Sequence, residues 1–131
     1  MEHPHKLVFT THIPMRWGDM DAMGHVNNTL YFRYAEQART EWIASMSLIE
    51  PGASVLINAS CTFLIPLTYP GTVEARIYLG RPGRSSIQTY YDLRPVGDER
   101  IYAEGSAKIV CTDPATGKSA PLPEGLRRMA E

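Results

Sequence analysis

The sequence predicts an α+β domain in which one long helix packs against an antiparallel sheet of five strands. Three observations support this fold class. A single helical period runs from 28 to 46, strand-like segments precede and follow it, and short turns join the four strands after it. Short turns connect neighbouring antiparallel strands, and a lone helix covers one face of the sheet that they form. Residues 1–131 are therefore expected to form a single domain.

The segment from 28 to 46 has the spacing of an amphipathic helix. Leu30, Tyr34, Ala38 and Trp42 recur every four residues, which places their side chains on one face of a helix. This apolar stripe is about as long as a small sheet is wide. We therefore expect the stripe to face the sheet.

The other elements are predicted as strands from their apolar runs and from alternation. Val73, Ala75 and Ile77 alternate with charged or polar residues. A period of two is typical of a strand with one buried face. The predicted strands cover 6–17, 54–65, 72–80, 85–94 and 100–112, the last being the longest, and a short helix is predicted over 126–129.

Charge and composition exclude several classes of protein. Thirteen basic and fourteen acidic residues give a net charge of -1 without a basic block, so we expect neither a nucleic-acid partner nor a membrane-surface patch. Cys61 and Cys111 lie in apolar strand-like runs and are predicted to be free thiols. No run of about 18 apolar residues occurs, and the first residues contain no apolar leader. The expectation is a cytoplasmic protein.

The loop before the helix carries a specific motif, which reads Asp-Met-Asp-Ala-Met-Gly-His-Val-Asn-Asn-Thr-Leu-Tyr from Asp19 to Tyr31. It resembles the D-x-D-x-x-G-H-V-N-N-x-x-Y signature of the 4-hydroxybenzoyl-CoA thioesterase-like group of hotdog proteins and matches that signature at every position. The resemblance implies a hotdog fold, in which the sheet wraps around the long helix, and acyl-CoA or aroyl-CoA thioesterase activity without a cofactor. Weaker matches follow in order at Glu36 and Arg39, Phe63 to Leu67, 84–86 and 117–123.

The resemblance assigns the main catalytic roles to Asp21 and Asn28. Asp21 matches the carboxylate that acts on the thioester, and Asn28 matches the residue whose amide lies at the oxyanion site. A helix N-terminus presents unpaired N–H groups and a partial positive charge, so it polarises a thioester carbonyl. A bend at Gly24 lets Asp21 approach this terminus, and either Asn27 or Asn28 caps the helix. The sequence leaves open whether Asp21 attacks the thioester or activates water.

Several residues of the motif have two interpretations. Asp21 itself could cap a turn, and Asp19 is interpreted as shaping the loop through bonds to backbone amides. His25 is predicted to be catalytic, orienting the carboxylate or the substrate, with a structural role as the alternative. Glu36 is an alternative base, unless it forms an ion pair within the helix with Arg39. The motif matches no zinc signature, so no metal is expected.

The predicted substrate site extends beyond the catalytic loop. Arginine is suited to the phosphates of CoA, although a solvated turn has the same composition. The resemblance implies a homodimer or homotetramer in which Asp21 of one chain meets strand and hairpin residues of its neighbour. A sheet face carrying Tyr78, Tyr90 and Tyr102, predicted to be uncovered, also favours self-association. The predicted substrate-binding residues are Asn27, Tyr31, Phe63, Arg84, Ser85 and Ser86.

Two other functions are compatible with this fold. One is a hotdog dehydratase, although such enzymes pair His and Asp in a different loop context. The other is a non-catalytic protein that binds acyl-CoA. The sequence does not define the length or aromaticity of the acyl group.

Overall fold

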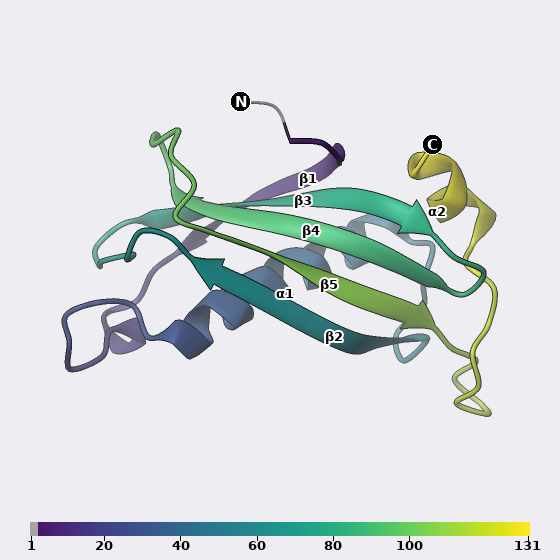
Figure 1. Ribbon diagram of the computed structural model, residues 1–131. Helices are drawn as coiled ribbons and strands as arrows, with labels where there is room; N and C mark the ends of the chain where they lie inside the picture. The colour runs from purple at the N-terminus through teal and green to yellow at the C-terminus, as the bar shows by residue number, and fades with distance from the viewer. Residues whose placement is uncertain (1–2) are drawn as a thin grey trace.

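The chain folds into a five-stranded antiparallel sheet crossed by one long helix, as the computed structural model of residues 3–131 shows (Figure 1). This confirms the predicted α+β class and the hotdog arrangement. The strand order in the sheet is β1-β3-β4-β5-β2, so β1 and β2 are the edge strands. The elements are β1 (Lys6–Pro14), the 3-10 turn η1 (Trp17–Asp19), α1 (Asn28–Met46), β2 (Ser54–Phe63), β3 (Thr72–Pro82), β4 (Ser86–Pro95), β5 (Ala103–Cys111) and α2 (Glu124–Met129).

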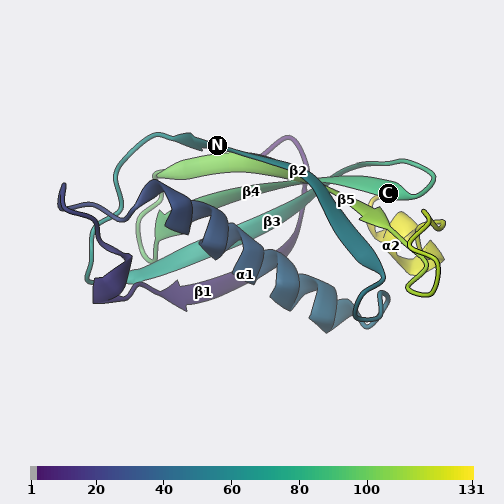
Figure 2. The same cartoon turned by 90° about the horizontal axis from the view of Figure 1, so that it is seen from below.

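Helix α1 lies across one face of the sheet (Figure 2). Its predicted stripe faces the sheet, because Tyr34, Ala38 and Trp42 are buried. Trp42 and Leu67 are among the largest side chains that are fully enclosed. Burying aromatic and aliphatic side chains of this size is worth roughly 1.5–3 kcal/mol each, which explains why the helix docks on this face.

The two central strands show the alternation expected from the sequence. Val73, Ala75 and Ile77 of β3 are buried, while Glu74 and Arg76 between them are half-buried on the opposite face. Strand β4 pairs antiparallel with both β3 and β5. The helix-facing side chains of β3 and β4 therefore form the floor of the core.

Several predicted strand boundaries were wrong. Strand β1 ends at Pro14 rather than at 17, and the 3-10 turn Trp17–Asp19 follows it. Strand β5 begins at Ala103 rather than at 100, and the longest strand is β3, with 11 residues. The later start of β5 has a local cause. Asp98 Oδ1 accepts a hydrogen bond from the Arg100 amide at 2.9 Å, which stabilises a turn at these residues.

The sheet face opposite α1 is partly covered, which corrects the prediction of an open face. The His3 ring stacks on Tyr78 with 3.6 Å between ring centroids, and the His5 ring stacks on Tyr90 at 4.1 Å. Tyr78 is consequently buried in the single chain. Residues 3–5 thus lie against the outer face of the sheet.

Both cysteines are free, as predicted, with Cys61 half-buried and Cys111 buried. Between residues 3 and 131, no helix has the length and apolar character needed to cross a membrane. The same part of the chain holds no group of three or more His, Cys, Asp and Glu side chains arranged to bind a metal ion.

Candidate active site

The loop between η1 and α1 is closed by backbone hydrogen bonds. The Asp21 amide donates to the His25 carbonyl at 2.8 Å, and the Gly24 amide donates to the Asp21 carbonyl at 3.2 Å. Gly24 has a φ of 83°, a conformation that glycine adopts without strain. The predicted bend at Gly24 is therefore present, and it turns the chain back toward the start of α1.

Asp19 is buried at the base of this loop. Its Oδ2 accepts hydrogen bonds from the Tyr34 hydroxyl at 2.7 Å and from the Arg16 amide at 3.0 Å. Burial acts to raise the pKa of Asp19, but these hydrogen bonds and the Arg16 guanidinium outweigh it and hold the pKa below the usual 3.8. Asp19 thus bonds a backbone amide, as interpreted from the sequence, and it also ties the loop to α1.

Asp21 is half-buried and has one carboxylate oxygen free. Its Oδ1 accepts a hydrogen bond from the Met23 amide at 2.9 Å, so the side chain does stabilise a turn. No residue between 3 and 131 donates a hydrogen bond to Oδ2. The turn bond orients the carboxylate, and its second oxygen is available to a water molecule or a substrate carbonyl carbon.

The first turn of α1 is capped by Asn27 rather than Asn28. Asn27 Oδ1 accepts hydrogen bonds from the Thr29 amide at 2.9 Å and from the Thr29 hydroxyl at 2.7 Å. The amide of Asn28 donates to no residue within 3–131. This free N–H lies at the positive end of the helix dipole, so it can donate a hydrogen bond to the oxygen of a polarised carbonyl.

Replacement of Asn27 by Ala is expected to lower the free energy of unfolding by about 1 kcal/mol, because the first turn of α1 loses its side-chain cap. Urea denaturation followed by circular dichroism measures this change. Asn28→Ala is the matched control and should cost less. Equal losses for the two variants would show that Asn27 is not the cap.

Tyr31 and Phe63 meet beside the loop. Their rings make an edge contact with 5.0 Å between centroids. Tyr31 is buried, and its hydroxyl oxygen accepts a hydrogen bond from the Leu67 amide at 2.8 Å. The Leu67 carbonyl in turn accepts a bond from the Val26 amide at 2.9 Å. The crossover from β2 to β3 therefore holds the loop before α1, a link that local sequence patterns did not reveal.

His25 and Glu36 are both exposed. The backbone carbonyl of His25 closes the loop, whereas its ring makes no hydrogen bond to residues 3–131. Glu36 lies 3.9 Å from the Arg33 guanidinium. The ion pair expected within the helix thus forms with Arg33 and not with Arg39. Arg39 instead lines a cavity together with Leu56 and Ala59 of β2.

The hairpin residues Arg84, Ser85 and Ser86 lie at the opposite end of the molecule from Asp21. The Arg84 carbonyl accepts hydrogen bonds from the Leu122 amide and from Arg127 of α2. Helix α2 lies beyond the C-terminal end of α1, whereas the loop that holds Asp21 lies at its N-terminal end (Figure 1). A 19-residue helix is about 28 Å long, so one chain does not bring these two groups together.

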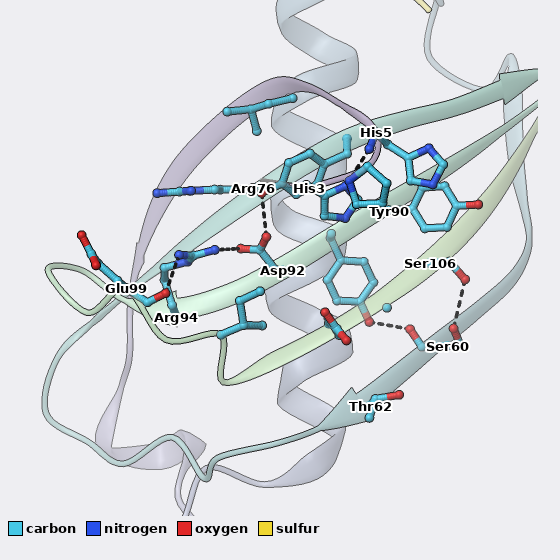
Figure 3. A pocket seen from close by; sticks show the side chains of 17 residues that line it. His3, His5, Ser60, Thr62, Arg76, Tyr90, Asp92, Arg94, Glu99 and Ser106 are labelled. Atoms are coloured by element: carbon cyan, nitrogen blue, oxygen red, sulfur yellow. Dashed lines mark hydrogen bonds and ion pairs between the residues drawn. The ribbon is translucent and has the colours of Figure 1, made fainter. Parts of the chain in front are cut away.

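An open groove of about 1200 Å³ lies on the outer face of the sheet (Figure 3). At its floor, Asp92 accepts hydrogen bonds from the Tyr78 hydroxyl at 2.7 Å and from Arg94 at 2.8 Å. Burial and the bond to Asp92 raise the pKa of Tyr78 to about 12. The groove lies across the sheet from α1 and does not include Asp21. It is therefore separate from the loop that holds the predicted catalytic carboxylate.

The fold and the loop geometry together define a class of enzyme. The family model of the thioesterase-like superfamily matches residues 15–129, which include the loop, α1 and strands β2 to β5. The chain belongs to the thioesterase-like superfamily, which places it among the thioester hydrolases.

Solved structures agree with this assignment. The chain is similar to a candidate thioesterase from Pseudomonas aeruginosa, with 39% identity over 96% of this chain and 100% of that one and a TM-score of 0.90. A candidate acyl-CoA thioesterase from Xanthomonas campestris is 28% identical over 88% of this chain and 99% of that one, with a TM-score of 0.78. A 1,4-dihydroxy-2-naphthoyl-CoA thioesterase from Synechocystis shares the fold, with 20% identity over 91% and 92% of the two chains and a TM-score of 0.78. Comparison with curated proteins finds no significant match.

Proposed function

We propose that this protein hydrolyses acyl-CoA thioesters and that Asp21 is its catalytic carboxylate. One observation carries the proposal: the loop that leads into α1 holds the free Oδ2 of Asp21, and the first residue of that helix, Asn28, has a free N–H. A thioester hydrolase needs an attacking or activating group on one side of the carbonyl and a hydrogen-bond donor for its oxygen. The names of the similar solved structures support CoA as the thiol.

The reaction follows from these two groups. The Asn28 amide and the helix dipole stabilise the negative charge on the carbonyl oxygen as a nucleophile adds to the carbon. The carbon–sulfur bond then breaks, and CoA leaves as a thiolate that takes up a proton. If Asp21 attacks directly, a mixed anhydride forms and water hydrolyses it; if Asp21 acts as a base, water adds in a single step. A single turnover in heavy-oxygen water tests direct attack, because label that enters the Asp21 carboxylate shows that water opened an anhydride at the Asp21 carboxyl carbon.

The complete site is proposed to need two chains. Strand β2 is an edge strand, and its Val55, Leu56 and Ile57 side chains are 46%, 47% and 55% exposed. An apolar strand edge of this kind pairs with another strand. A two-fold axis at the β2 edge pairs the two copies of β2 antiparallel.

Such a pairing reverses one sheet relative to the other. Ser86 lies beside Val110, which pairs with Val55 near the start of β2, whereas Phe63 ends the strand beside the catalytic loop. The two-fold therefore brings the Arg84–Ser86 hairpin of one copy toward the Asp21 loop of the other. In this arrangement the Arg84 guanidinium is available to a CoA phosphate, and His25, Asn27, Tyr31 and Phe63 line the same boundary.

Subunit complementation tests the two-chain site. Asp21→Asn and a triple alanine variant of Arg84, Ser85 and Ser86 are each purified and are expected to release little CoA. After co-refolding at equal amounts, about a quarter of the parental activity should return, because half of the dimers are mixed and one of their two sites is intact. No recovery in confirmed mixed dimers would place all functional residues in one chain.

Free-thiol detection on a panel of acyl-CoAs separates hydrolysis from the alternatives. We expect CoA release from at least one panel member. A protein that binds acyl-CoA without releasing CoA would be a non-catalytic binder. Loss or gain of water within the acyl group, without thiol release, would indicate a hotdog dehydratase.

A further inference from the structure

A small cavity lies between α1 and β2, near the middle of the helix. Its volume is about 80 Å³. Its apolar walls are Phe32 and Ala35 from α1 and Leu56 and Ala59 from β2. We name this cavity the α1–β2 crevice. Its remaining lining residues are the polar side chains of Glu36, Arg39 and Tyr91.

Arg39 contributes a half-buried guanidinium without a partner. No carboxylate between residues 3 and 131 forms an ion pair with it. Burial lowers the pKa of Arg39, and the more distant charge of Glu36 only partly opposes this. Glu36 itself pairs with Arg33. Removing a cation from water without a paired anion is unfavourable, so the position is suited to an anion supplied from outside the chain.

The seam between α1 and β2 joins the crevice to the loop before α1. Beside that loop, Tyr31 of α1 and Phe63 of β2 meet with 5.0 Å between ring centroids. Further along the seam, the crevice walls from α1 and β2 face each other. Tyr91 of β4 closes the crevice toward the sheet, and its hydroxyl donates a hydrogen bond to the Ser60 carbonyl of β2 at 2.7 Å. An acyl group that enters at the helix N-terminus has this seam as its path.

The helix sets the length of that path. Arg39 follows Asn28 by about three helical turns, or roughly 16 Å along the axis. Long side chains on a helix lean toward its N-terminus, so the guanidinium lies closer to the thioester than its Cα does. A succinyl group is too short to reach it, whereas acyl groups of intermediate length are suited to the distance.

We propose that Arg39 makes this enzyme selective for acyl groups that end in a carboxylate, that is, for CoA monothioesters of dicarboxylic acids. This inference rests on the proposed thioesterase function. A guanidinium pairs with a carboxylate through two charge-assisted hydrogen bonds, and the apolar crevice walls contact the methylene chain. The distal carboxylate takes no part in the chemistry; water still cleaves the carbon–sulfur bond and the products are the diacid and CoA.

The test compares matched substrates. CoA release is measured for adipoyl-, suberoyl- and sebacoyl-CoA, each against the neutral acyl-CoA with the same number of carbons. The parent should prefer the carboxylate-ended substrate, and Arg39→Met should reduce the ratio of the two kcat/KM values by roughly ten- to a hundredfold, the effect of losing a charge-assisted pair. Arg39→Lys keeps the charge without the bidentate geometry and should give an intermediate ratio. Arg100→Met is the control and should leave the ratio unchanged, because Arg100 is exposed, pairs with Asp98 and does not line the crevice.

The outcomes are distinguishable. If the parent does not discriminate within any pair, or if Arg39→Met and Arg39→Lys keep the parental ratio, the inference is wrong while the thioesterase function stands. If Arg39→Met changes the oligomeric state in size-exclusion chromatography and leaves the ratio unaltered, Arg39 pairs with a second copy of the chain instead. Release of CoA from no substrate would overturn the proposed function as well.

Discussion

Asp21→Asn is expected to lower kcat/KM for acyl-CoA hydrolysis by roughly 10²–10⁴-fold, the largest effect of any single replacement proposed for this protein. An Asn side chain has nearly the same shape and can still accept the Met23 amide bond that orients position 21. It has no negative charge, so it neither attacks a carbonyl carbon nor removes a proton from water. Steady-state release of free thiol from the best substrate of the panel measures the change.

Asp113→Asn is the matched control for this experiment. Asp113 Oδ1 accepts a hydrogen bond from the amide two residues later, that of Ala115, at 2.8 Å, just as Asp21 does with Met23. Asp113 follows β5, and the turn after β5 and the loop before α1 lie at opposite ends of the sheet (Figure 1). The Asp113→Asn variant should retain parental activity. If Asp21→Asn is as active as this control, the carboxylate of Asp21 is only a turn cap and the proposed mechanism fails.

Asp19→Ala is expected to lower the free energy of unfolding by about 2–4 kcal/mol, the largest stability effect among our predictions. The change leaves the buried Tyr34 hydroxyl and the Arg16 amide without their acceptor, and each orphaned polar group is costly. Urea denaturation of purified variants measures the loss. A loss below about 0.5 kcal/mol, the size of an ordinary surface substitution, would contradict the structural role assigned to Asp19.

Tyr34→Phe is the companion variant and should cost about 1–2 kcal/mol, because it removes one of the two bonds to Asp19. The double variant should be more stable than the sum of the two single losses implies, since both changes remove the same interaction. Additive losses would indicate that Tyr34 and Asp19 stabilise the protein independently.

Acid should reduce the contribution of Asp19 to the free energy of unfolding. The folded protein holds the pKa of Asp19 below 3.8, its usual value, so the unfolded chain binds the proton more readily. The stabilisation is therefore complete above pH 3.8 and is lost as the pH falls through the lower, folded pKa. The stability difference between the parent and Asp19→Asn should shrink over this acid range. A difference that stays constant down to complete acid unfolding would show that the carboxylate charge has no part in it.

Local patterns in the sequence were sufficient for most of the fold. The four-residue spacing of Tyr34, Ala38 and Trp42 predicted both α1 and its buried face, since burial of that face is what stabilises the helix. The alternation of apolar and polar residues likewise predicted β3 and β4 and their buried faces. The ends of β1 and β5 were less predictable, because a turn hydrogen bond at Asp98 and the 3-10 turn after Pro14 compete locally with strand pairing.

The sequence predicted only part of the loop before α1. Its motif indicated Asp21 and Asn28 as site residues and Gly24 as the position of the bend, because a motif and a turn both involve residues that are close in the chain. Leu67 holds the loop through Val26 and Tyr31, and it lies in a crossover segment about 40 residues further along the chain. Nothing in local periodicity encodes such a contact, and the same holds for the unpaired guanidinium of Arg39.

The sequence by itself determined the class of fold, the helix and the identity of the motif residues, because periodicity and turn chemistry act between near neighbours. The tertiary structure decided which groups meet. It showed Asp19 bonded to Tyr34, an oxygen of Asp21 and the amide of Asn28 without a partner within residues 3–131, and the Arg84–Ser86 hairpin at the far end of α1. Those relations arise from the antiparallel register of the sheet and the length of the helix packed across it, which bring together or separate residues irrespective of their distance in the chain.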